Sequence, residues 1–309
     1  MTNETIRVGG QAVIEGVMMR TPGAMAVAVR KPNGEISVKT RLLTPPAARH
    51  WLLRLPLVRG VVTLGQSLIL GVQALNFSAN ESLEEEGESL GVVSLSLTLL
   101  VAFALGIGLF VYLPLLLTNL LKAYVPLVAD SSLVFNLIDG IIRIAFFLAY
   151  IFGISLIKDL RRVFEYHGAE HKTIYAYEHG DELTPAQADK YSTLHPRCGT
   201  NFLLIVMLLS MLVFSVLRAD AAFYVKFLSR LVFIPLIAGI SYEIIRFAGK
   251  NQAKTWVRRL MAPGLYLQKI TTKPPSPAQV EVAIRSLQEA LKLEKEHHAT
   301  ARDPFEVVM

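Results

Sequence analysis

The chain alternates between long apolar stretches and shorter segments rich in charge. Residues 89–121 contain no charged side chain, and this run is longer than the roughly 20 apolar residues that one membrane crossing requires. Three further apolar stretches follow along the chain, and Pro235 predicts a kink in the last of them. We therefore expect four membrane-spanning helices, over about residues 91–117, 133–157, 202–217 and 231–247.

The stretch from Pro56 to Glu81 has a different pattern. Its apolar residues recur at helical spacing on one stripe, formed by Val61, Leu64, Leu68, Val72 and Leu75. Polar side chains occupy the other positions, which is typical of an amphipathic helix. We expect this helix to lie in the membrane interface or to pack as a re-entrant element, and residues 82–89 to form an acidic surface linker.

The N-terminal region carries the only strand signals. Residues 24–30 and 36–42 alternate around Asn33-Gly34, a pair that supplies the positive φ of a tight turn, so we expect a β-hairpin. Before it, glycines 9, 10, 16 and 23 interrupt an apolar segment. Such glycines either cradle an anion or allow close backbone packing, and the absence of a Walker or dinucleotide spacing favours packing.

Two helices are expected after the last span. A basic helix over residues 251–260 should end at Met261-Ala262-Pro263-Gly264, and Ser276-Pro277 should begin a second helix that runs to about Glu296. The chain then divides into six segments: an N-terminal region 1–55, an interfacial helix and linker 56–90, two spans 91–157, a polar segment 158–200, two spans 201–250 and C-terminal helices 251–309. The expected fold is a mainly α polytopic membrane protein with a small cytoplasmic β-hairpin region.

Composition narrows the class of protein. A hydrophobic content of 52% and a mean hydropathy of +0.44 exclude an ordinary soluble domain. The net charge of +6 comes from basic residues that flank apolar runs and do not alternate with aromatics, so we expect the lipid bilayer and not nucleic acid as the partner. A single cysteine excludes an internal disulfide, and the N-terminal residues contain no signal-peptide pattern.

The distribution of basic residues predicts the orientation. Residues 158–199 and 248–273 each hold six Lys or Arg, whereas residues 118–132 hold one and 218–230 hold three. Because cytoplasmic loops carry the excess of basic residues, both termini and the segment 158–199 should lie in the cytoplasm, with the chain in the inner membrane.

Candidate chemistry is concentrated in that cytoplasmic segment. His167, Glu170 and His171 form an H-x-x-E-H motif, the reversed zinc-protease signature, whose histidines share one face of a helix. We expect the second span to continue as one helix through about Glu178 and to carry this face. His195-x-x-Cys198 follows at a spacing that lets a turn bind one metal ion.

The candidate metal ligands are therefore His167, His171, His195 and Cys198, for a divalent ion and most naturally Zn²⁺. Four protein ligands would saturate the ion and make the site structural, whereas three ligands and a water would leave Glu170 as a general base. An amphipathic helix with incidental histidines is the alternative. The resemblance to soluble reversed-motif proteases also implies a downstream glutamate ligand, for which Glu243 is the candidate, although the large soluble fold of those proteases is missing.

Charged residues also occur inside the expected spans. Asp139 and Arg143 are spaced i, i+4, so each can neutralise the other at membrane depth. The pair indicates either a polar pathway or a structural ion pair. Glu243 and Arg246 lie near the end of the fourth span.

Three segments resemble one known family. GGQAVIEGVMMR, EYHGAEHKTIYAYEHG and HPRCGTNFL are similar to the YqhQ-like family of bacterial membrane proteins, a family of unknown function described as predicted metal-dependent enzymes. The resemblance implies a metal and names no substrate.

Two functions follow from the sequence. The first is a metal-dependent hydrolase that acts on a lipid, a lipid-linked molecule or a peptide reached from the cytoplasmic face. The second is a non-enzymatic transporter, lipid-handling or assembly protein in which the histidine segment is structural.

Overall fold

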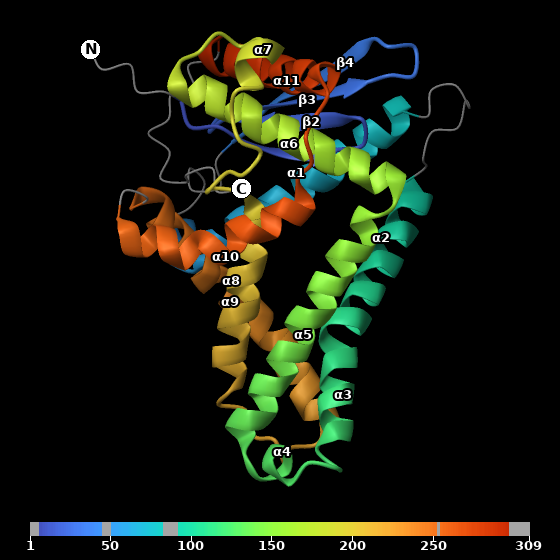
Figure 1. The fold of residues 1–309 in the computed structure, drawn as a ribbon, viewed down its shortest axis with the longest axis vertical. Coiled ribbons are helices and arrows are strands. Elements are labelled where there is room, and N and C mark those ends of the chain that lie inside the picture. The colour runs from blue at the N-terminus through green and yellow to red at the C-terminus, as the bar shows by residue number, and fades with distance from the viewer. Residues whose placement is uncertain (1–5, 45–50, 83–91, 252–253, 297–309) are drawn as a thin grey trace.

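The computed structural model describes residues 6–44, 51–82, 92–251 and 254–296. The chain is mostly helical, with a small sheet layer at one end and a bundle of long helices extending from it (Figure 1). Residues 83–89 of the expected acidic linker lie outside the described part of the chain, as do His297 and His298.

The sheet contains four antiparallel strands in sequence order: β1 (Gly9–Val13), β2 (Gly16–Arg20), β3 (Ala24–Arg30) and β4 (Ile36–Leu42). The predicted hairpin is confirmed as β3–β4, and Gly34 has the expected positive φ of 88°. The glycine-rich segment forms a second hairpin, which the sequence did not predict. A Cβ at Gly16 would lie 2.2 Å from the carbonyl oxygen of Ala28, as close backbone packing requires.

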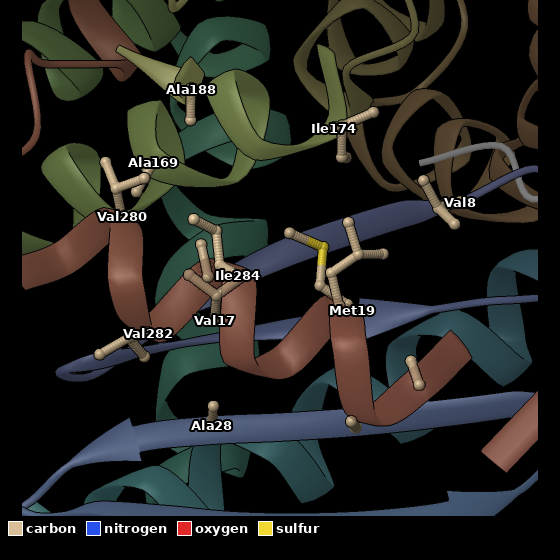
Figure 2. Close-up of a cluster of buried hydrophobic side chains, with 14 of the residues drawn as sticks. Val8, Val17, Met19, Ala28, Ala169, Ile174, Ala188, Val280, Val282 and Ile284 are labelled. Atoms are coloured by element: carbon tan, nitrogen blue, oxygen red, sulfur yellow. The ribbon is translucent and has the colours of Figure 1, made fainter. Parts of the chain in front are cut away.

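Helices cover both faces of the sheet. Strand side chains alternate between faces, and Val17 and Met19 pack under α6 (Lys158–His179) and α11 (Pro277–Glu296), as Figure 2 shows. Met18, between them, packs on the opposite face against α1 (Val58–Ser82). The start of α11 is confirmed, because Ser276 accepts a hydrogen bond from the backbone of Gln279.

The bundle consists of long helices that run away from the sheet (Figure 1). They are α2 (Val92–Ile107), continued through a π-turn η3 (Gly108–Tyr112) into α3 (Leu113–Leu121), then α5 (Ser132–Ser155), α8 (Gly199–Phe214) and α9 (Phe223–Lys250). Short segments complete the described chain: η2 (Trp51–Arg54), α4 (Pro126–Asp130) and α7 (Pro185–Ala188).

Among the described residues, four helices are long and apolar enough to cross a membrane, which suggests a membrane protein. Three of them contain most of the first, second and fourth predicted spans. The third predicted span is the helix α8, which is apolar but shorter than a full crossing. The fourth long helix is α1, for which an interfacial position was expected.

The placement of α1 differs from that of the bundle helices. In Figure 1 it runs across the long axis, between the sheet and the bundle. One face is buried, including Leu70 and Ala74 against the sheet, while Val61, Leu68 and Leu75 of the predicted stripe are exposed. An apolar stripe opposite a covered face is the pattern of an interfacial helix.

Three predicted helix boundaries are wrong. The second span does not continue into the motif helix: α5 ends at Ser155 and α6 begins at Lys158, because the chain turns from the bundle direction to lie on the sheet. The helix α9 begins at Phe223 and not at Leu231, which brings Lys226 and Arg230 inside it.

The third error concerns α10 (Thr255–Thr271), which continues through the expected break at residues 261–264. Gly264 packs so closely on α8 that a Cβ there would lie 2.1 Å from Asn201 Oδ1. This tertiary contact outweighs the low helix propensity of Pro263-Gly264.

Candidate metal centre

Three elements bring the candidate ligands together. The helix α6 carries His167, Glu170 and His171 on one face, and a salt bridge from Arg162 to Glu15 anchors its first turns to the β1–β2 turn. Cys198 is the N-cap of α8 and reaches the same place from the bundle side. One donor atom from each of His167, His171 and Cys198 lies within 4.8 Å of the others.

Backbone carbonyls determine which nitrogen each histidine presents. His167 Nδ1 lies 2.8 Å from the carbonyl oxygen of Thr271, and His171 Nδ1 bonds the carbonyl oxygen of Thr193. A carbonyl only accepts hydrogen bonds, so both Nδ1 atoms carry a proton, and in the neutral form of each ring the Nε2 atom presents a lone pair. Metal-binding histidines are held in this way by a partner on the other nitrogen.

The two Nε2 atoms converge on one thiol. His167 Nε2 is 3.2 Å from Cys198 Sγ, and His171 Nε2 is buried without a hydrogen-bond partner among the described residues. Burial alone would raise the pKa of the Cys198 thiol, but His171 and Thr200 lower that pKa below its ordinary value. Burial and His167 lower the pKa of His171. A thiol has one proton for two lone pairs, whereas a cation satisfies both imidazoles and a thiolate together.

Gly168 explains how the Thr271 carbonyl reaches the site. A Cβ at this position would lie 2.2 Å from the carbonyl oxygen of Lys273, so only glycine lets the segment after α10 pass so close to α6. The same segment is fixed by a hydrogen bond from Lys273 N to the Phe164 carbonyl oxygen (2.9 Å).

Glu170 is buried beside the three donors. The backbone N–H of Gly10 donates to it, and a Cβ on Gly10 would lie 2.8 Å from Glu170 Cγ. Burial raises the pKa of Glu170 to about 8, against the opposing effect of His167. The strand β1 therefore fixes the position of this buried carboxyl group beside the three donors.

A cavity of about 350 Å³ adjoins this cluster. His167, Glu170 and Cys198 line it, together with residues of β1, α1, α6, α8 and α9: Gly10, Gln11, Ala12, Leu64, Ser67, Val163, Phe164, Gly199, Thr200, Phe202, Tyr242 and Ile245. The cluster thus has an open side at which a small group can approach both the donors and Glu170.

His195 lies outside the group of three donors. Its Nδ1 accepts a hydrogen bond from Arg197 N (3.4 Å), and its Nε2 faces Glu178 Oε2 at 3.7 Å. Burial, with His167, lowers the pKa of His195 to about 4. The Gln268 side chain accepts a hydrogen bond from the N–H of His195 and donates one to its carbonyl oxygen. These two bonds hold the turn before α8 against α10. Nothing in the sequence signalled the roles of Gln268, Thr193 and Thr271.

The expectation that Glu243 is a downstream ligand is wrong. Its carboxylate pairs with Arg59 of α1, with Arg59 Nε 2.7 Å from Oε1. The predicted pair of Asp139 and Arg143 is confirmed at 2.9 Å. Arg230 joins it, with Nη2 3.0 Å from Asp139 Oδ2, a contact hidden from the sequence because residue 230 was placed in a loop.

Comparison with known proteins gives a family without a described activity. The profile of a family described as "Protein of unknown function (DUF1385)" matches residues 55–293. The chain is 31% identical over 299 residues to "Uncharacterized protein YqhQ" of Bacillus subtilis (strain 168), covering 93% of this chain and 92% of that protein. No solved structure matches. The resemblance to the YqhQ-like family is thereby confirmed.

Proposed function

We propose that this chain, which belongs to the DUF1385 family of proteins of unknown function, is a metal-dependent hydrolase at the cytoplasmic face of the inner membrane. His167, His171 and Cys198 would hold a divalent ion, most naturally Zn²⁺, and Glu170 would be the general base. The observation that carries the proposal is the grouping of the His167, His171 and Cys198 donors, in which His171 Nε2 is buried without a hydrogen-bond partner among the described residues.

The chemistry follows from three donors and one open side. A bound Zn²⁺ would polarise the scissile carbonyl and activate water, as in catalytic sites with three protein ligands. Glu170 accepts a proton from the attacking water and delivers it to the leaving group. The cavity beside Glu170 supplies the room for the substrate that a closed structural site lacks.

A thiol nucleophile is the second candidate. Cys198 lies at the N-terminus of α8 and 3.2 Å from an imidazole, an arrangement that activates cysteine for acyl transfer. Such a pair needs only one histidine, whereas a metal ion would use His167 and His171 together with Cys198, so we favour the metal.

Metal analysis of detergent-purified protein tests the proposal. We expect about one ion per chain in the wild type and in Glu170→Gln, since a general base can be removed without emptying the site. His171→Ala should lose the ion. His179→Ala is the matched control, because His179 lies on the same helix but is exposed.

Three results would decide against this function. Protein that purifies without stoichiometric metal, and whose melting temperature ignores chelators, contradicts a metal site of any kind. Metal-free protein in which Cys198 reacts rapidly with iodoacetamide supports the thiol nucleophile. If Glu170→Gln leaves cellular function unchanged and His171→Ala lowers stability, the metal site is structural and the protein is not an enzyme.

A further inference from the structure

The walls of the cavity beside the cluster are mainly apolar and come from several helices. Leu64 of α1, Phe164 of α6, Phe202 of α8 and Ile245 of α9 contribute side chains. Two of these helices, α1 and α9, are among those long and apolar enough to cross a membrane. The cavity therefore lies where the sheet layer meets the part of the bundle that lipid surrounds.

Apolar side chains continue from the cavity to the molecular surface. Leu64 and Leu68 are spaced i, i+4 on α1, as are Leu160 and Phe164 on α6, so each pair forms one ridge. The inner member of each ridge lines the cavity, while Leu68 is 55% and Leu160 37% exposed. Leu203, next to Phe202, is also exposed.

Apolar side chains near this opening are exposed on the neighbouring helix α5 and at the corner that follows it. In Figure 1 the helices α2 and α5 diverge from α8 and α9 as they approach the sheet. Phe152, on the last turns of α5, and Ile157, at the corner before α6, are both more than half exposed. Apolar surfaces at membrane depth are in contact with acyl chains, since lipid is the solvent there.

The side chains that line the cavity carry no positive charge. Within the described chain none of its lining residues is Lys or Arg; apart from the donor cluster, its polar side chains are Gln11, Ser67, Thr200 and Tyr242. The N-terminus of α8, at Gly199 and Thr200, also lines the cavity and would suit a carbonyl oxygen that gains negative charge during attack. A phosphate group is normally bound by Arg or Lys side chains as well, so these neutral side chains fit an uncharged ester or amide group better.

Resting on the proposed function, we propose that the substrate is an uncharged acyl amphiphile that enters the cavity laterally from the bilayer. Its ester or amide carbonyl meets the cluster, and its acyl chain lies along the ridges of α1 and α6. In the reaction a water oxygen attacks the carbonyl carbon and the bond from that carbon to the leaving oxygen or nitrogen breaks. One proton passes through Glu170 to the leaving group, which gives a carboxylic acid and an alcohol or amine.

Lateral access is tested without activity by tryptophan fluorescence. With Trp51 and Trp256 replaced by Phe, single tryptophans are placed by Leu64→Trp, by Leu100→Trp at an exposed position of α2 and by Lys292→Trp at an exposed position of α11. In phosphatidylcholine vesicles with brominated acyl chains we expect strong quenching at positions 64 and 100 and none at 292. Quenching at 64 no greater than at 292 would overturn lateral entry.

The same measurement in a His171→Ala background separates the two proposals. Quenching at position 64 should persist there, because the ridge does not depend on the ion. If metal is lost and quenching is retained, lateral access does not depend on the metal site. If metal is retained and quenching at position 64 is absent, lateral access is contradicted and the metal-dependent function is not.

The substrate class is tested with 4-methylumbelliferyl esters of butyrate and dodecanoate. We expect kcat/KM to be at least about tenfold higher for the longer ester, since each buried methylene adds discrimination. Leu64→Gln should abolish this preference while metal content stays constant, and Leu75→Gln, on the same stripe two turns beyond Leu68, should keep it. Metal-loaded protein that cleaves peptides or phosphate esters, and neither acyl ester, would refute the substrate class.

Discussion

Gly168 shows how one missing side chain controls the candidate site. Alanine is the better helix former, by about 1 kcal/mol, so the propensity of α6 alone would favour Gly168→Ala. The Lys273 carbonyl lies where that methyl group would be, and moving it displaces the Thr271 carbonyl that orients His167.

We predict that Gly168→Ala lowers the melting temperature and weakens metal binding by roughly 10- to 100-fold, as the loss of an orienting partner does at metal sites. The reason is the displaced carbonyl and not the helix. Isothermal titration with Zn²⁺ after chelation measures the affinity. Gly65→Ala on α1 is the control, because a Cβ there meets nothing within 4 Å; equal effects of the two changes would contradict this account.

Residue spacing predicted part of this site and missed the rest for a physical reason. The i, i+4 rule predicted that His167 and His171 lie together, and the structure has both beside Cys198. It could not say which nitrogen each ring presents, because the deciding partners are backbone carbonyls that carry no side-chain signature. His195, which the His-x-x-Cys spacing grouped with the ligands, lies outside the group of three donors.

Among the elements, α5 and α9 are joined by charge at the end of the bundle far from the sheet. Asp139 is buried between Arg143 of its own helix and Arg230 of α9. Asn136 adds a further bond to Arg230. One carboxylate thus holds two guanidinium groups inside a bundle of helices, several of which are long and apolar enough to cross a membrane.

We predict unequal costs for removing these charges. Asp139→Leu should destabilise the protein by about 3–5 kcal/mol, because it strands buried cations. Arg143→Met should cost less, since Arg230 still neutralises Asp139. Chemical unfolding in detergent measures both, and Arg285→Met on exposed α11 is the control. If Asp139→Leu were no worse than Arg143→Met, the arginines would not depend on one carboxylate.

Element types were more predictable than element boundaries. Asn33-Gly34 and Ser276-Pro277 carry local signals that tertiary contacts did not oppose, and both predictions are confirmed. The break expected near Pro263 failed because Gly264 packs on Asn201. The bend before Lys158 has no local sequence signal, because its cause is the tertiary packing of α6 on the sheet.

For the whole molecule, the connection at α4 lies at the opposite end from α6 and α7 (Figure 1). If a bilayer surrounds the bundle, these two ends face different compartments. The loop charges then orient the chain, because the end that carries residues 158–199 holds six basic residues.

We predict that reporter fusions at residue 180 are cytoplasmic and that fusions at residue 125 are on the other side. If α1 lies along the interface, as its exposed apolar stripe indicates, fusions at residues 57 and 90 should both be cytoplasmic. Green fluorescent protein and alkaline phosphatase, each active on one side only, provide the measurement. Opposite signals at 57 and 90 would show that α1 crosses the membrane, and an active phosphatase at 180 would reverse the topology.

The first strands and the last helix of the described chain are joined by hydrogen bonds. The sheet therefore cannot complete these bonds until the end of synthesis. Met19 N donates to Ser286, and Thr21 and Gly23 bond Glu294, all from α11. The ribosome releases β1–β4 first and α11 last, with every helix of the bundle synthesised in between. The hydrogen bonds between the sheet and α11 can therefore form only after the bundle helices have been synthesised. Thr271, which orients His167, is also synthesised late, so the contacts that position the histidine–cysteine cluster become complete only near the end of synthesis.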